Sequence, residues 1–162
     1  MQNNDLFLWL KAAAAAVVGG FSAAFGWLGW LVLIWAGCMV MDYITGSAGA
    51  MRTGDWDSAT ARSGIWHKAG MIVVVIVAAL CDSVISLMLA HVPVVLPFKY
   101  KVMIVPIVLI WYIFTELGSI AENAVKMGAN VPAALVAILK AGKLAAEKAL
   151  PEAADSEDKD NG

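Results

Sequence analysis

Four carboxylates lie in or beside segments of the chain that are otherwise apolar, and they are the residues best placed to do chemistry. Asp82 lies near the middle of one apolar run and Glu116 lies within another, whereas Asp42 and Glu122 lie near the ends of such runs. An ionised carboxylate at mid-membrane costs on the order of 2.5–3.5 kcal/mol, so Asp82 is expected to face protein or water, or to be protonated. Intramembrane acids often serve as proton or cation relays.

The stretch from 111 to 123, WYIFTELGSIAEN, places a polar face on an otherwise apolar helix. At about 100° per residue, its polar side chains share roughly a third of the helix circumference, and the other positions are apolar. The polar arc comprises Tyr112, Thr115, Glu116, Ser119, Glu122, Asn123 and Lys126. Such a helix has one side suited to lipid and one side suited to a wetter environment or to another helix.

No catalytic or cofactor-binding motif accompanies these acids. His67 and His91 are far apart, Cys38 and Cys81 form no CxxC pair, and no zinc-protease, Walker or dinucleotide-binding pattern occurs. No serine or cysteine has a histidine partner in its region, and the basic residues are too scattered to bind nucleic acid. The sequence therefore predicts a protein that is no enzyme and that uses no cofactor, metal ion or nucleic acid. Both cysteines are expected to be small buried hydrophobic residues.

The composition is that of an integral membrane protein. Of the 162 residues, 61% are hydrophobic and 15% are charged, and the mean hydropathy is +0.77. Soluble domains are only roughly 45–50% apolar. The apolar runs are long and continuous, which favours helices over the alternating strands of a membrane barrel. We expect an all-α membrane protein with four transmembrane helices, near residues 6–25, 27–45, 69–91 and 102–121.

The number of spans depends on the uncharged segment 12–41. As one helix it would be about 45 Å long, against a hydrocarbon core of about 30 Å. Gly26 and Gly29 permit a turn that divides it into two spans, whereas a single tilted helix would leave three spans in all. Small residues at four-residue spacing in this segment form a helix-packing face, or else reflect the abundance of alanine in apolar helices. They are Ala12, Ala16, Gly20 and Ala24.

The polar segments predict the orientation of the chain. A short connector that ends at Lys68 follows the second expected span, and its tryptophans suit the headgroup region. An amphipathic helix is expected over 129–150, followed by a disordered acidic tail over 151–162. Basic residues are concentrated in the connector and the C-terminal region, so the positive-inside rule places both in the cytoplasm.

The order of these elements resembles the toxin-secretion and phage-lysis holin family. The matching pieces lie between Leu31 and Leu139, and they are MDYITG at 41–46, SGIWHK at 63–68, the intramembrane Asp82, ELGSIAENA at 116–124, Gly128 and Val131-Pro132. The resemblance implies a multi-pass protein of the bacterial cytoplasmic membrane with a holin domain over 1–128. Such a protein associates with itself in the bilayer and opens lesions. An endolysin, with which it forms no stable complex, then reaches the peptidoglycan.

Taken with the resemblance, the polar residues are expected to line a seam between subunits or the wall of a lesion, and Glu116 is the strongest candidate. The set comprises Asp42, Asp82, Thr115, Glu116, Ser119, Glu122 and Asn123. Three other functions stay open. The chain could be a small channel or transporter component that uses Asp82 and Glu116 as a relay, a holin-like protein for secretion of toxins or enzymes, or a membrane anchor for a cytoplasmic partner.

Overall fold

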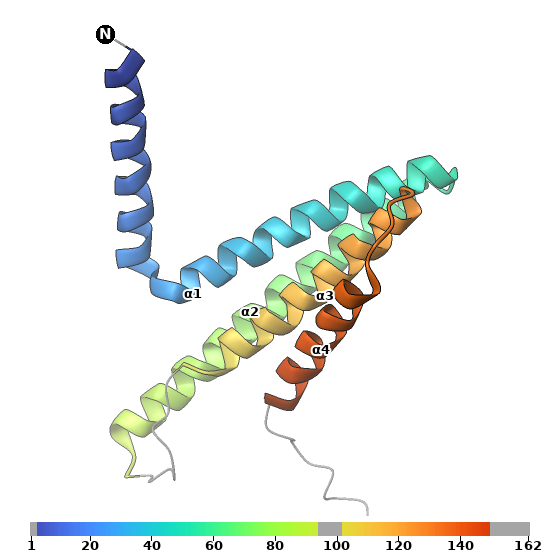
Figure 1. Ribbon diagram of the computed structural model, residues 1–162. Coiled ribbons are helices and arrows are strands. Elements are labelled where there is room, and N and C mark those ends of the chain that lie inside the picture. Colours follow the sequence, from blue (N-terminus) through green and yellow to red (C-terminus); the bar gives the residue numbers. More distant parts are fainter. Residues whose placement is uncertain (1–2, 94–101, 150–162) are drawn as a thin grey trace, which may run out of the picture.

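The computed structural model describes residues 3–93 and 102–149, and its regular structure over these residues is entirely helical. The helices are α1 (Asn3–Thr53), α2 (Ser58–His91), α3 (Ile104–Lys126) and α4 (Ala133–Ala149) (Figure 1). Each of α1, α2 and α3 is long and apolar enough to cross a membrane. The expected all-α membrane protein is therefore confirmed in these terms. The expected tail 151–162 and residues 94–101, which lie between the last two expected spans, are outside the described residues.

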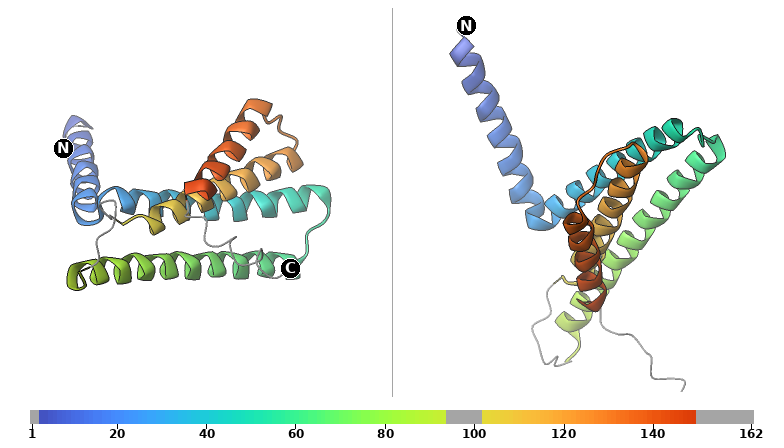
Figure 2. Two further views of the ribbon diagram at one scale, coloured as in Figure 1. Left: turned by 90° about the horizontal axis from the view of Figure 1, so that it is seen from below. Right: turned by 45° about the vertical axis from the view of Figure 1, so that its right-hand side comes forward.

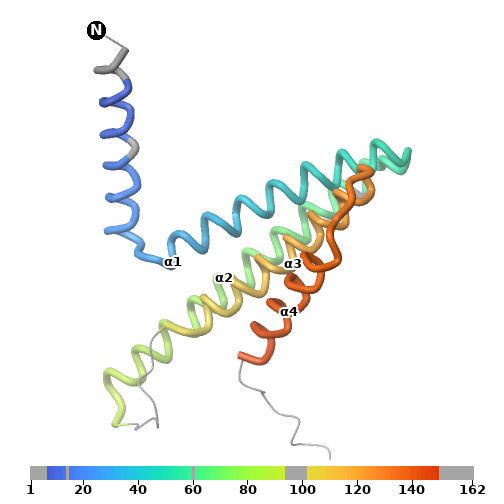
Figure 3. The backbone as a smooth tube through the Cα atoms, in the orientation of Figure 1, coloured from blue at the N-terminus to red at the C-terminus, as the bar shows by residue number. Residues whose placement is uncertain are grey.

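α1 is broken at Gly26, where the sequence predicted a turn (Figure 3). The backbone there has φ 59° and ψ −156°, a conformation that is essentially restricted to glycine. A Cβ at Gly29 would overlap the side chain of Phe25, so the second glycine permits close packing beside the break. The Trp30 indole donates a hydrogen bond of 3.0 Å to the Ser22 hydroxyl across the break. The two halves diverge in an open V, and the fourth span stays a prediction.

α3 is the centre of a three-helix bundle that it forms with α2 and the second half of α1. Both neighbours pack on α3, whereas they contact each other only slightly (Figure 2). The side chain of Leu109 on α3 is completely buried. The apolar core around it comprises Trp35, Cys38, Met71, Ala78, Val105, Leu109 and Ile113.

α2 turns one narrow stripe toward the bundle. Its less exposed positions are separated alternately by three and four residues, with Ala69 beside them: Ala61, Gly64, Lys68, Met71, Val75, Ala78, Asp82, Ile85 and Leu89. This is the heptad spacing of helices that pack side by side. From Ile72 to Met88 the exposed side chains of α2 are mainly apolar, as lipid contact requires. Cys81 is among these exposed side chains, so its expected burial is wrong, whereas that of Cys38 is confirmed.

The connector between α1 and α2 is shorter than expected. The apolar pattern predicted helix ends near residues 45 and 69, but α1 continues to Thr53 and α2 begins at Ser58. Polar residues therefore form the helix ends, and only residues 54–57 join them. Gly54, with φ 80°, allows the chain to reverse there.

α4 folds back along α3 after a break that begins at Gly128. The backbone N–H groups of Gly128 and Ala129 donate to the carbonyls of Val125 and Ala124, which closes α3 in a Schellman motif. In α4, Leu139 and Ala146 are buried, whereas Leu135 and Ile138 are exposed. The cytoplasmic position of this helix stays a prediction.

Candidate functional site

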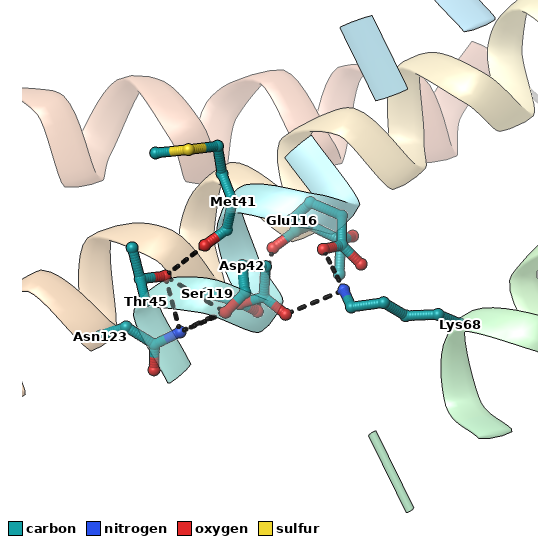
Figure 4. A network of polar contacts seen from close by, with 8 residues as sticks. Met41, Asp42, Thr45, Lys68, Glu116, Ser119 and Asn123 are labelled. Atoms are coloured by element: carbon teal, nitrogen blue, oxygen red, sulfur yellow. Dashed lines mark hydrogen bonds and ion pairs between the residues drawn. The ribbon is translucent and has the colours of Figure 1, made fainter. Parts of the chain in front are cut away.

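A network of charged side chains joins α1, α2 and α3 near one end of the bundle (Figure 4). Lys68 of α2 places its ammonium between two carboxylates. Its Nζ lies 2.9 Å from Oδ2 of Asp42 on α1 and 2.6 Å from Oε2 of Glu116 on α3. The Glu116 side chain is 5% exposed, and those of Lys68 and Asp42 are 16% and 21% exposed. Charges removed from water in this way depend on their partners for stability.

Asn123 extends the network along α3, two helical turns beyond Glu116. Its Nδ2 donates to Oδ1 of Asp42 at 3.0 Å and to Oγ1 of Thr45 at 3.3 Å. The Thr45 hydroxyl in turn donates to backbone carbonyls of the preceding turn of α1. Asp42 therefore uses one carboxylate oxygen for Lys68 and the other for Asn123. This arrangement fixes α1 against both of its neighbours.

The network contains two carboxylates and one ammonium. When all three groups are ionised, it carries one excess negative charge. The Lys68 ammonium occupies the space between the two carboxylates. A cavity of about 300 Å³ lies beside the network, between the end of α1, the connector and the start of α2. Its lining includes Asp42, Asp55, Asp57, His67, Lys68 and Lys126.

Asp82 lies at the opposite end of the bundle and caps α3. Its carboxylate accepts hydrogen bonds from the backbone N–H groups of Met103 (3.1 Å), Ile104 (3.0 Å) and Val105 (2.8 Å). N–H groups at a helix start have no partner within the helix, and a negative charge there is favoured by the helix dipole. Asp82 is 3% exposed. Asp82 therefore joins α2 to the start of α3, and its use as a relay stays a prediction.

The polar arc of α3 is divided between two neighbours. Glu116 and Asn123 face α1 and α2, whereas Thr115, Ser119 and Glu122 line a cavity of about 310 Å³ between α3 and α4. The seven predicted residues thus occupy three places: the network, the cap of α3 and the surface facing α4. Their role in a lesion or a subunit seam stays a prediction. So does the packing role of Ala12, Ala16, Gly20 and Ala24, which are exposed in the first half of α1.

Lys68 is the residue of this site that sequence reasoning missed. Hydropathy alone places Lys68 in the connector, as one of the basic residues that indicate orientation. A signal for its role exists, because Lys68 lies fourteen residues before Asp82, which is two heptads, and so on the same face of α2. Extending the stripe of Asp82 toward the start of α2 would have identified it.

Comparison with known proteins identifies the family of this chain. The model of the Bacteriophage holin family matches residues 19–143. The chain belongs to the bacteriophage holin family. An uncharacterized protein of Halalkalibacterium halodurans is 32% identical over 134 residues, which cover 81% of this chain and 93% of that protein. No solved structure matches the chain.

The family assignment confirms the resemblance given by the sequence motifs. The holin match begins before the break at Gly26 and ends within α4, so it includes the Lys68 network and the Asp82 cap. Together with the three long apolar helices, it identifies a holin-like membrane protein. Both polar contacts between helices therefore belong to the holin domain of this chain.

Proposed function

We propose that this protein accumulates in the cytoplasmic membrane of a bacterial host, associates with itself and opens lesions through which an endolysin reaches the peptidoglycan. The observation that carries the proposal is the Lys68 network, a partly buried set of charged side chains between three long apolar helices of a holin-family chain. Lipid provides no hydrophobic drive for helices to associate, so association depends on small and polar residues. The endolysin needs only the opening, without a stable complex.

Such a protein needs an exterior that suits lipid before it opens a lesion, and polar groups that meet water and other subunits afterwards. The network can provide both. While Lys68 is paired with Asp42 and Glu116, the polar groups face one another and the outside of the bundle suits lipid. Once α2 separates from α1 and α3, the same carboxylates and Asn123 become available to water and to other subunits. In this proposal the network lies toward the cytoplasm, on the same side as the C-terminus, because basic residues gather there.

A second function is favoured by one feature of the network. A lysine between two carboxylates could pass protons or small cations, as in a channel or transporter component. Purified protein in vesicles distinguishes the two functions. A relay gives graded ion flux and retains a large dye, whereas a holin releases the dye. Secretion of a toxin or enzyme would use the same opening, and the identity of the released protein would reveal it.

The deciding experiment is inducible expression in bacteria with and without an endolysin. We expect abrupt growth arrest and loss of membrane potential in both cultures, with lysis only where the endolysin is present.

At matched membrane levels, Glu116→Gln should shift the onset of lysis, because it alters the buried partner of Lys68. Lys148→Gln is the matched control, since it also removes one charge and lies at an exposed position of α4, outside the network. Absence of arrest and lysis with the natural chain would reject the function, and unchanged timing in Glu116→Gln would remove the network from it.

A further inference from the structure

α4 covers the part of the polar arc of α3 that the Lys68 network leaves free (Figures 1 and 2). The cavity between the two helices is lined by Thr115, Ser119 and Glu122 of α3 and by Lys140 and Lys143 of α4. The two hydroxyls donate to α3 carbonyls at 2.9 and 3.3 Å, so their remaining capacity is to accept hydrogen bonds. α3 thus offers acceptors and a carboxylate, and α4 offers two ammonium donors.

A small set of contacts holds α4 on α3. The Trp111 indole donates to Oε1 of Glu147 at 2.9 Å, and Nζ of Lys143 lies 4.6 Å from the centre of the Trp111 ring, within the range of a cation–π contact. The closest approach is at Gly142, where an added Cβ would overlap the ring of Phe114. Glycine at this position is therefore a condition for the docking of α4.

The docked position conflicts with an α3 that spans a bilayer. Trp111 lies eleven residues before Glu122, which is about 17 Å along the helix, roughly half of a hydrocarbon core of about 30 Å. A docked α4 would hold Lys143 and Glu147 at that depth, where charged side chains are costly. In return α4 buries only two of its described side chains. The contacts of α4 with α3 are therefore weak enough for another helix to replace them.

We propose that the α3 face beneath α4 is the surface on which two copies of the chain associate, and that α4 is an internal cover which must leave first. This inference rests on the proposed function. A second α3 fits the face because Gly118 is open to close approach, with no heavy atom within 4 Å of an added Cβ. Beside it, Thr115 and Ser119 provide the polar contacts that join helices in lipid. Gly128, with φ 92°, begins the segment about which α4 can turn away.

Gly142→Leu tests the cover directly, because the leucine cannot occupy the space filled by the Phe114 ring. We expect several-fold more cross-linked dimer in membranes than for the natural chain at equal levels, and earlier lysis when an endolysin is present. Ala141→Leu is the matched control, since it adds the same side chain at an exposed position of α4 and should change neither readout. Phe114→Ala combined with Gly142→Leu makes room for the leucine and should restore both readouts.

A second measurement confirms that α4 has moved. In a chain whose two natural cysteines are replaced by serine, the thiol of Leu139→Cys should resist a water-soluble reagent and should react once Gly142→Leu is added, because Leu139 is buried in the docked helix. If the thiol reacts while dimer yield and lysis timing stay unchanged, α4 is no competitor and the inference is overturned. A thiol that stays protected in Gly142→Leu overturns it equally. If the natural chain neither cross-links nor lyses cells, the proposed function itself fails.

Discussion

Replacing Lys68 by methionine tests whether the network holds the bundle together. Methionine keeps an unbranched apolar side chain and removes the charge, which leaves the nearly buried Glu116 carboxylate without its cation. Removal of one partner of a buried ion pair costs about 3–5 kcal/mol. Asp42 is 21% exposed and keeps its hydrogen bond from Asn123, so the cost arises mainly at Glu116. We therefore expect a loss of about 3 kcal/mol in unfolding free energy, at the low end of that range.

The assay is reversible unfolding of the purified protein in detergent by titration with sodium dodecyl sulfate. Glu116→Gln and the double variant with Lys68→Met complete a double-mutant cycle, which isolates the interaction between the two side chains. The double variant should be at least about 1 kcal/mol more stable than the sum of the single losses predicts. Lys148→Met, at an exposed position of α4, is the control and should stay within about 0.5 kcal/mol. A coupling energy below about 0.5 kcal/mol would refute the ion pair as a stabilising contact.

The other contacts give two further predictions. Asp82→Ala removes the carboxylate that caps the start of α3 and should cost about 1–2 kcal/mol in the same titration, as loss of a helix cap does. Ser83→Ala removes only a bond within α2 and should cost less, so equal losses would contradict the cap. Gly26→Ala places a Cβ at φ 59°, which costs about 1–3 kcal/mol unless α1 straightens. Spin labels on the two halves should then move apart, whereas Gly20→Ala should leave their distance unchanged; no difference between these two variants would argue against the break.

The sequence was sufficient to predict those parts of the fold that depend on residues close together in the chain. Long uncharged runs predicted spanning helices, because a backbone in lipid must satisfy its own hydrogen bonds. The break at Gly26 followed from a glycine within an apolar segment too long for one upright span. The polar arc of α3 followed from helical periodicity, and the motifs from 41 to 132 carried the family resemblance. Each of these inferences uses residues that are close together in the chain.

Contacts between distant residues were beyond this reasoning. The position of the Lys68 ammonium between Asp42 and Glu116 depends on how three helices pack, and hydropathy assigned that lysine to a connector. The division of the polar arc was missed for the same reason, since a face is defined only by what packs against it. α4 supplies that neighbour, and its position on α3 is decided by Gly142 and the Phe114 ring.

The two polar contacts that α2 makes with α3 also restrict how these helices can move. Lys68 and Asp82 lie about 21 Å apart along α2, and their partners Glu116 and Val105 lie about 17 Å apart along α3. A slide of α2 by one turn, 5.4 Å, would break both contacts at once, and no intermediate register would restore either of them. Both contacts can therefore form in only one register of α2 against α3. Any change of state in this bundle is then expected to swing or separate whole helices, while ratcheting of one helix past another is blocked.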